Sequence, residues 1–263
     1  PSTTGPTAAE EGPAFGTGNN NYGQQQRDTD NPQNHPGHHF AGSVNLLNGN
    51  YFLTVGDFFI PGRGLSLQLA RSYNSLAAAN GERGAFGYGW THSYETHVIS
   101  ETGGSTLEVV EADGAPHVYA QMGPCSDGIG ICYAPPEGFY RQLRALPDGT
   151  FLLIHKNGTT QTFKENGRLM AIRDRHENAI RLHYNGSSMD CIIPGPPGTL
   201  CRVDGPSGQR SLVFGYVEGP GYALVGLISE WPDTGDERVI TYQYDADSNL
   251  IDVAYPEEPP DTN

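Results

Sequence analysis

Short alternating apolar runs, each closed by a polar turn, recur along the second half of the chain and constrain its fold more than any other feature. The recurring segments are GRLMAIRDRHENAIRLHYN (167–185), GTLCRVDGPSGQRSLVFGY (198–216), YALVGLISEWPDTGDERVITYQYD (222–245) and YQYDADSNLIDVAYP (242–256). Each complete unit holds a leucine, an aliphatic residue, a turn with Gly, Asn or Asp, and a second alternating run. A period of about 28 to 30 residues predicts an array of stacked β-hairpins.

The units align on a small set of apolar residues, which we expect to form the repeated core. The first strands start at Leu169, Leu200, Leu224 and Leu250. The second strands align on Tyr184, on Phe214 with Tyr216, and on Tyr242 with Tyr244. Because side chains of a strand alternate between two faces, these positions predict one buried face along the array.

Composition favours strands over helices throughout. The 263 residues include 35 Gly, 20 Pro, 14 Tyr and 10 Phe, and no stretch has a helical apolar stripe. We therefore predict an all-β fold of antiparallel hairpins stacked as a short β-solenoid, with an extended N-terminal arm. The predicted divisions are a Gly/Asn/Gln-rich arm at 1–42, a β domain at 43–164 and the repeats at 165–263.

Charge and hydropathy limit the partners that we expect. The formal net charge is −15, which repels phosphate backbones, so nucleic acid is not an expected partner. No apolar run approaches the roughly 18 residues that span a bilayer. We expect the chain to associate with itself, or with the remainder of a longer polypeptide.

The four cysteines form two close pairs in sequence. Cys125 and Cys132 enclose SDGIGI, and Cys191 and Cys201 enclose IIPGPPGTL, two intervals rich in Gly or Pro. Such loops fold back easily, so local disulfides are the favoured pairing, and zinc ligation is the alternative. Disulfides imply an oxidising compartment, and we predict a secreted or cell-surface protein.

The residues resemble a known family. GRLMAIRDRHENAIRLHYN and YQYDADSNLIDVAYP look like the YD repeats of RHS proteins, and residues 43–90 look like the domain that starts such arrays. The most specific match is RSYNS followed by FGxGW, that is Arg71, Tyr73, Asn74 and Ser75, then Phe86, Gly87, Gly89 and Trp90. The resemblance implies a β-solenoid that in long members spirals into a shell around a toxic cargo. The chain departs from the family in the number of repeats, because it has about four units whereas a full shell needs many.

Three clusters resemble metal sites. Asp245, Asp247 and Asn249 have the spacing of half a calcium loop, but the sixth position is leucine, so a turn is favoured. HENAI at His176 lacks the second histidine of a zincin motif. The weak metal candidates are therefore His35, His38 and His39, and no cofactor is expected.

Three functions fit these features. We predict a non-enzymatic structural protein that self-associates into an extracellular filament or surface assembly, with the arm or the open solenoid end supplying the contact. The alternatives are the N-terminal part of a toxin-encapsulating RHS shell and a glycan-binding adhesin. No pair of polar groups has the spacing of a catalytic mechanism, so no enzyme activity is predicted.

Overall fold

The protein is all-β and antiparallel, as the sequence predicts. The computed structural model describes residues 40–41, 44–45, 49–62, 64–100, 105–186, 190–219, 222–231 and 238–256. Within them lie a 14-stranded sheet, a three-stranded sheet, two short two-stranded pairs and the helix α2 (Ser75–Ala79). The expected arm at 1–42 lies almost wholly outside the described residues, as do His35, His38 and His39.

The large sheet pairs its strands in chain order, so each strand hydrogen-bonds to the strands before and after it. Its strands are β8 (His97–Ser100), β9 (Thr106–Val110), β10 (Pro116–Pro124), β11 (Ile131–Ala134), β12 (Gln142–Ala145), β13 (Phe151–Ile154), β14 (Thr160–Phe163), β15 (Leu169–Arg173), β16 (Ala179–Tyr184), β17 (Leu200–Asp204), β18 (Ser211–Gly219), β19 (Tyr222–Trp231), β20 (Val239–Tyr244) and β21 (Leu250–Ala254). The sheet runs without a break across residue 164, where the sequence suggests a domain boundary; the predicted divisions remain a prediction.

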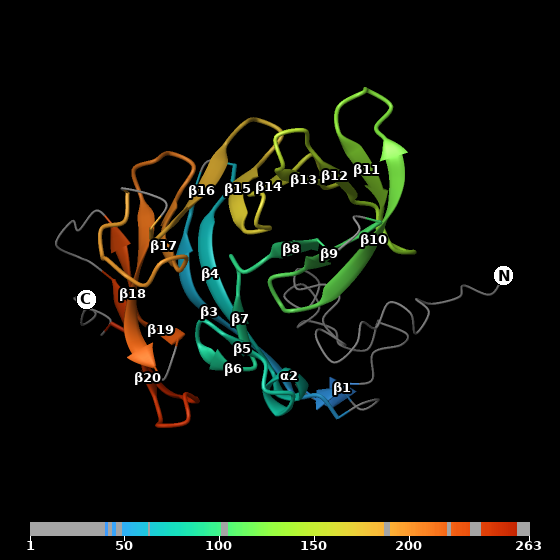
Figure 1. Ribbon diagram of the computed structural model, residues 1–263. Coiled ribbons are helices and arrows are strands. Elements are labelled where there is room, and N and C mark those ends of the chain that lie inside the picture. Colours follow the sequence, from blue (N-terminus) through green and yellow to red (C-terminus); the bar gives the residue numbers. More distant parts are fainter. Residues whose placement is uncertain are drawn as a thin grey trace.

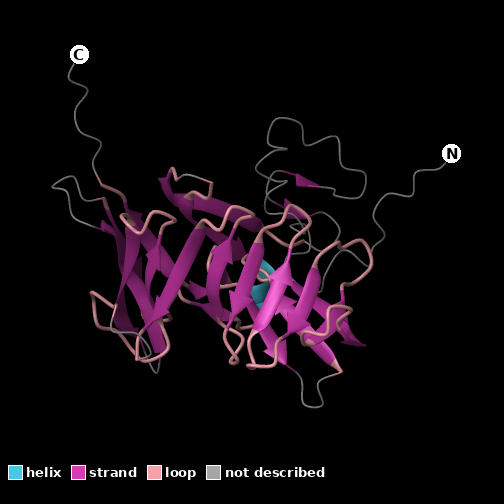
Figure 2. Cartoon of the chain, turned by 90° about the horizontal axis from the view of Figure 1, so that it is seen from above, coloured by secondary structure: helices cyan, strands magenta, loops and turns pink. Residues whose placement is uncertain are grey.

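The smaller sheets come from the first part of the chain. The three-stranded sheet has the order β3 (Phe52–Ile60), β4 (Leu67–Asn74) and β7 (Trp90–His92); the pairs are β1 (Phe40–Ala41) with β2 (Val44–Asn45) and β5 (Arg83–Gly84) with β6 (Gly87–Tyr88). Figure 1 shows the large sheet bent into an arc with β3, β4 and β7 inside it. Figure 2 shows the chain from above, where the strands of the large sheet lie side by side and helix α2 lies behind them.

One hairpin turn recurs along the large sheet. In the turn Lys164–Arg168, the first N–H donates to the fifth carbonyl and the fourth N–H donates to the first carbonyl. Here glycine takes the fourth position with a positive φ, Gly167 at 79°, because glycine adopts this backbone region without strain. The same pattern occurs at 111–115, 146–150 and 155–159. The DG and NG dipeptides therefore mark three-residue loops rather than two-residue turns.

The sheet bends far enough to meet its own first strand. The N–H of Val98 in β8 donates to the carbonyl of Gly167 at 2.9 Å, and His97 forms a bridge with Arg168. A Cβ at Gly167 would overlap the carbonyl oxygen of Val98, so this contact requires glycine. The turn between β14 and β15 thus covers part of the β8 edge, and β15 to β21 continue past it.

A single hydrophobic core fills the arc. Its members include Phe58, Leu67 and Phe86 from the first part of the chain and Leu143 and Val225 from the large sheet, all nearly inaccessible to solvent. Since both sheets contribute to one cluster, the small sheet packs against the concave face of the large one.

The repeat has a consistent register with one correction. Tyr184 faces Leu200 and Tyr244 faces Leu250 across strand pairs that carry a β-bulge just before the tyrosine. Tyr216 also follows a bulge, but it faces Val225, and Leu224 faces Val217. The sequence alignment that started a unit at Leu224 is therefore one residue out of register, because Leu224 and Val225 are adjacent apolar residues and the alignment chose the leucine.

Candidate functional site

A buried ion pair lies where the small sheet meets the last strands of the large sheet. The Nε of Arg71 in β4 is 2.5 Å from Oδ2 of Asp57 in β3, and its Nη2 is 2.9 Å from Oδ1. Both side chains are almost inaccessible, at 2% and 0%. Burial lowers the pKa of Arg71, but the hydrogen bonds and charge of Asp57 more than offset this, so its pKa stays above the usual value.

Two tyrosines near the end of the described chain complete this cluster. The hydroxyls of Tyr242 and Tyr255 donate to Asp57 at 2.9 and 3.0 Å. The Arg71 guanidinium also lies over the ring of Tyr242, 5.2 Å from its centroid. We call Asp57, Arg71, Tyr242 and Tyr255 the clasp, because they join β3 and β4 to β20 and the residues after β21.

The FGxGW segment packs against the clasp and allows the last hairpin to approach it. Phe86 is fully buried and meets Tyr242 edge to face at 4.9 Å, and Trp90 lies 5.0 Å from the Arg71 guanidinium. Gly87 has φ 94°, and a Cβ there would overlap the carbonyl oxygen of Ser248 in the turn before β21. The glycine therefore allows a close backbone approach between the motif and the last hairpin.

The RSYNS segment builds the corner after β4. Asn74 caps α2 by accepting from the N–H groups of Leu76 and Ala77, both at 3.1 Å. The hydroxyl of Ser75 accepts from the N–H of Tyr51 at 2.8 Å. Tyr73 packs on Trp90 with ring centroids 5.2 Å apart. The motif residues thus act together: they shape one corner and present Arg71 to Asp57.

The repeated tyrosines make a second set of equivalent contacts. The hydroxyls of Tyr184 and Tyr216 donate to the carbonyls of Leu169 and Leu200, each at 2.7 Å, and that of Tyr244 donates to Val225 at 2.8 Å. Burial raises the pKa of each tyrosine, so the hydroxyls stay protonated and remain donors. The tyrosines hold the two strands of their own hairpins together and expose no reactive group.

The two sequence segments that resemble metal motifs form the same turn. Asp245 accepts from the N–H groups of Asp247 and Asn249 at 3.0 and 2.8 Å, and Asp174 accepts likewise from His176 and Asn178 at 2.8 and 3.0 Å. Since the carboxylate oxygens accept from the turn itself, both segments act as hairpin turns. Among the described residues, no three His, Cys, Asp or Glu side chains gather as metal ligands.

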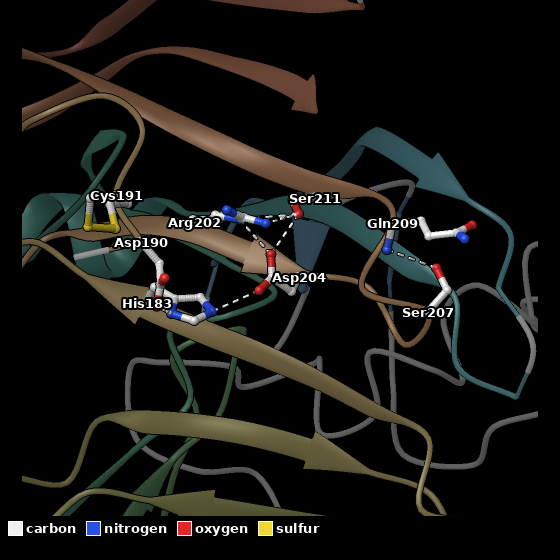
Figure 3. A network of polar contacts seen from close by, with 9 residues as sticks. His183, Asp190, Cys191, Arg202, Asp204, Ser207, Gln209 and Ser211 are labelled. Atoms are coloured by element: carbon white, nitrogen blue, oxygen red, sulfur yellow. Dashed lines mark hydrogen bonds and ion pairs between the residues drawn. A yellow bond between two sulfur atoms is a disulfide. The ribbon is translucent and has the colours of Figure 1, made fainter. Parts of the chain in front are cut away.

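Both cysteine pairs are bonded locally, Cys125 to Cys132 and Cys191 to Cys201, with Cα atoms 5.1 and 5.4 Å apart. Beside the second disulfide is a polar network on β16, β17 and β18 (Figure 3). His183 lies 3.2 Å from Asp190 and 2.9 Å from Asp204, and Asp204 accepts from the Ser211 hydroxyl at 2.6 Å. Because Ser211 donates to a carboxylate rather than to the imidazole, the network lacks the serine–histidine contact that activates a nucleophile.

A cavity of about 670 Å³ separates the small sheets from the concave face of the large one. Its walls include Glu95 and Trp90 from the motif region, and Arg168, Tyr184 and Tyr216 from the large sheet. Glu95 accepts from the N–H of Ala85 at 3.2 Å and lies 3.3 Å from His92. Nothing in the sequence pattern points to this cavity, because its lining residues come from distant segments.

Comparison with known proteins places the first part of the chain among described relatives. A family profile described as "Domain of unknown function (DUF6531)" matches residues 41–119. The tRNA nuclease WapA of Bacillus subtilis (strain 168) and the tRNA3(Ser)-specific nuclease WapA of Bacillus spizizenii are each 36% identical over 146 residues. The aligned part is 55% of this chain and 6% of each relative. These matches are consistent with an RHS-type protein.

The comparisons correct the functional prediction. The relatives are named as tRNA nucleases, so the prediction of a non-enzymatic filament protein, and with it the absence of enzyme activity, is wrong. The alternative of a toxin-encapsulating shell agrees better with them. No helix in the described part of the chain is long and apolar enough to cross a membrane.

Proposed function

We propose that this chain is the starting segment of a shell wall in a nuclease toxin of the WapA kind. The 14-stranded sheet forms the first part of the wall, and the small sheet fills its starting end. The nuclease activity named for the relatives belongs, in this proposal, to the longer polypeptide whose cargo the wall encloses. The long YD-repeat shells of RHS proteins, which the sequence resembles, have this organisation.

The contact between Val98 and Gly167 carries the proposal. A closed barrel pairs its first strand with its last, along their whole length. Here the first strand, β8, instead meets the turn between β14 and β15, and the sheet continues through β21. A sheet that passes its own beginning in this way can wind onward as a spiral.

The periodic contacts support the same proposal. Tyrosine hydroxyls join the two strands of one unit at Tyr184, Tyr216 and Tyr244, so each unit carries the same internal contact. Arrays of this type lengthen by adding units, because each unit contacts only its neighbours. β21 is the outer strand of the sheet in the described residues and offers the edge for a further hairpin.

Location and partners follow from this assignment. Two disulfides suit an oxidising compartment, and we propose a secreted or cell-surface polypeptide. The partner of the β21 edge is then a following hairpin of the same polypeptide rather than a second copy.

Protease protection of the complete polypeptide tests the proposal. The polypeptide encoded by the natural reading frame is purified, digested under native conditions and assayed for tRNA cleavage, alongside Asp57→Asn, which weakens the clasp. We expect the cargo to resist digestion in the natural protein and to become sensitive in the variant, while Asp252→Asn, an exposed change on β21, has no effect. A cargo that is digested equally in all three proteins contradicts the proposal.

A further inference from the structure

The cavity between the motif region and the large sheet has spare hydrogen-bond donors. Arg168, in the turn before β15, lines it and lies 5.6 Å from the centroid of the Tyr184 ring. Among the described residues, no carboxylate pairs with its guanidinium and no side chain or carbonyl accepts from it. A guanidinium stacked on a ring keeps its in-plane N–H groups available for a bidentate acceptor.

A second arginine of this cavity has a similar environment. Arg83 in β5 also lines the cavity, and its guanidinium lies over the ring of Tyr222. It too has no ion pair with any described carboxylate. The two arginines therefore come from different sheets and share one arrangement, an aromatic support with unused donors.

The carboxylates of the cavity, in contrast, have donors within the protein. Glu95 accepts from Ala85 and lies beside His92; Glu82 accepts from the Asn80 amide at 3.3 Å; and Glu111 pairs with Arg141. Each of these carboxylates thus has a donor among the described residues, whereas the guanidinium groups of Arg168 and Arg83 have no acceptor there. Guanidinium groups of this kind can bind a ligand that accepts hydrogen bonds and carries negative charge.

The guanidinium of Arg168 lies close to Gly198, because a Cβ built there would be 2.7 Å from one of its terminal nitrogens. The cavity volume of about 670 Å³ lies within the range of small-molecule sites. The walls also present rings of Trp90 and Tyr216, which suit an organic body attached to the anionic group.

We propose that this cavity binds an oxyanion group, a carboxylate or a phosphate, through the guanidinium groups of its arginines, Arg168 and Arg83. The ligand is either a small anionic molecule or an acidic side chain of a polypeptide segment that enters the cavity. The proposal is independent of the shell assignment, because it rests on the residues of the cavity alone.

Titration of the 263-residue chain tests this site. Inorganic phosphate and the peptide acetyl-Glu-Glu-Gly-amide are added separately at constant ionic strength. Binding is followed by the Nε–Hε resonances of the arginines and by Trp90 fluorescence in a Trp231→Phe background. We expect saturable shifts of the Arg168 and Arg83 resonances, with a dissociation constant of about 1 mM or lower for at least one probe. Phosphate binding indicates a small anion, and binding of the peptide alone indicates an acidic segment.

Substitutions separate specific binding from general charge effects. Arg168→Gln is expected to weaken binding about tenfold or more, since it removes a charge-assisted bidentate contact. Arg181→Gln, an exposed arginine on β16 without an ion pair among the described residues, is the matched control and should bind as the natural chain does. If Arg168→Gln does not fold, Arg168→Lys keeps the charge without the fork and is expected to bind with intermediate affinity. Equal affinity in the arginine and control variants, or no saturation with either probe, overturns the proposal.

Discussion

The small sheet and the large sheet are stabilised in different ways. In the large sheet each strand pairs with its neighbours in sequence, and equivalent tyrosines and turns recur from one hairpin to the next. In the small sheet, by contrast, a single buried ion pair contacts residues at the far end of the described chain. The comparison indicates that removing one contact of the large sheet destabilises one hairpin, and that equivalent contacts should have similar effects. Removing a contact of the clasp should destabilise the molecule as a whole.

Breaking the clasp should have the largest effect. Asp57→Asn leaves the Arg71 guanidinium buried without a counter-charge, and we expect a loss of about 3 to 5 kcal/mol in the free energy of unfolding. Chemical denaturation followed by fluorescence measures this loss. The control is Asp252→Asn, since Asp252 is exposed on β21. A change below about 1 kcal/mol in Asp57→Asn would mean that the clasp does not unite the two sheets.

Disrupting the contact between the β14–β15 turn and β8 should cause the second largest loss of stability. Gly167→Ala combines a positive φ with overlap of the Val98 carbonyl, and we expect a loss of about 2 kcal/mol or more. Gly208→Ala has a similar φ of 68° but meets no atom within 4 Å, so it should lose only about 1 kcal/mol. Thermal unfolding compares the two variants, and hydrogen exchange at the Val98 amide reports the contact directly. Equal losses in the two variants would show that the turn does not hold the β8 edge.

The repeated tyrosines test whether the hairpins are equivalent. Tyr184→Phe, Tyr216→Phe and Tyr244→Phe each remove one hydroxyl that donates to a carbonyl. We expect each substitution to lower the free energy of unfolding by about 1 kcal/mol. Tyr140→Phe is the control because that side chain is 77% exposed. Denaturant midpoints give the four values. Widely different losses among the three core tyrosines would argue against a modular array.

The smallest effect should appear as a pH dependence at Asp204. Burial alone raises the pKa of this carboxyl, but hydrogen bonds from Ser211 and Arg202, together with the positive charges of Arg202 and His183, hold its pKa below the usual value. A depressed pKa contributes stability above the unfolded value of about 3.9, and this stability is lost as the pH falls through the folded value. Unfolding measured from pH 6 to about pH 2 should therefore show a shallower acid decline in Asp204→Asn than in the natural chain. Identical slopes would show that the network in Figure 3 is not linked to stability.

The sequence predicts the local features of this fold better than the distant ones. Alternating runs and Gly, Asn or Asp turns are short-range signals, and they identify the hairpins and their aromatic positions. The register error at Leu224 arises because Leu224 and Val225 are adjacent apolar residues, and the sequence pattern does not show which of them faces Tyr216. The motif residue Arg71 is conspicuous, but its partners Asp57 and Tyr255 have no pattern that marks them. They are selected by the way the arc folds around the small sheet, as is the cavity lined by Arg168 and Arg83.

The clasp also has a consequence for how the chain folds. Asp57 and the Tyr255 hydroxyl that donates to it are 198 residues apart, so their contact closes a loop that contains nearly every strand. Loops of this length form slowly, because their closure entropy must be met before the contact contributes any stability. During synthesis the strands between these two residues can pair as they leave the ribosome. The carboxylate of Asp57 gains the Tyr255 hydroxyl as a donor only afterwards. The hydrogen bond from Tyr255 to Asp57 can therefore form only after the chain has been synthesised through Tyr255.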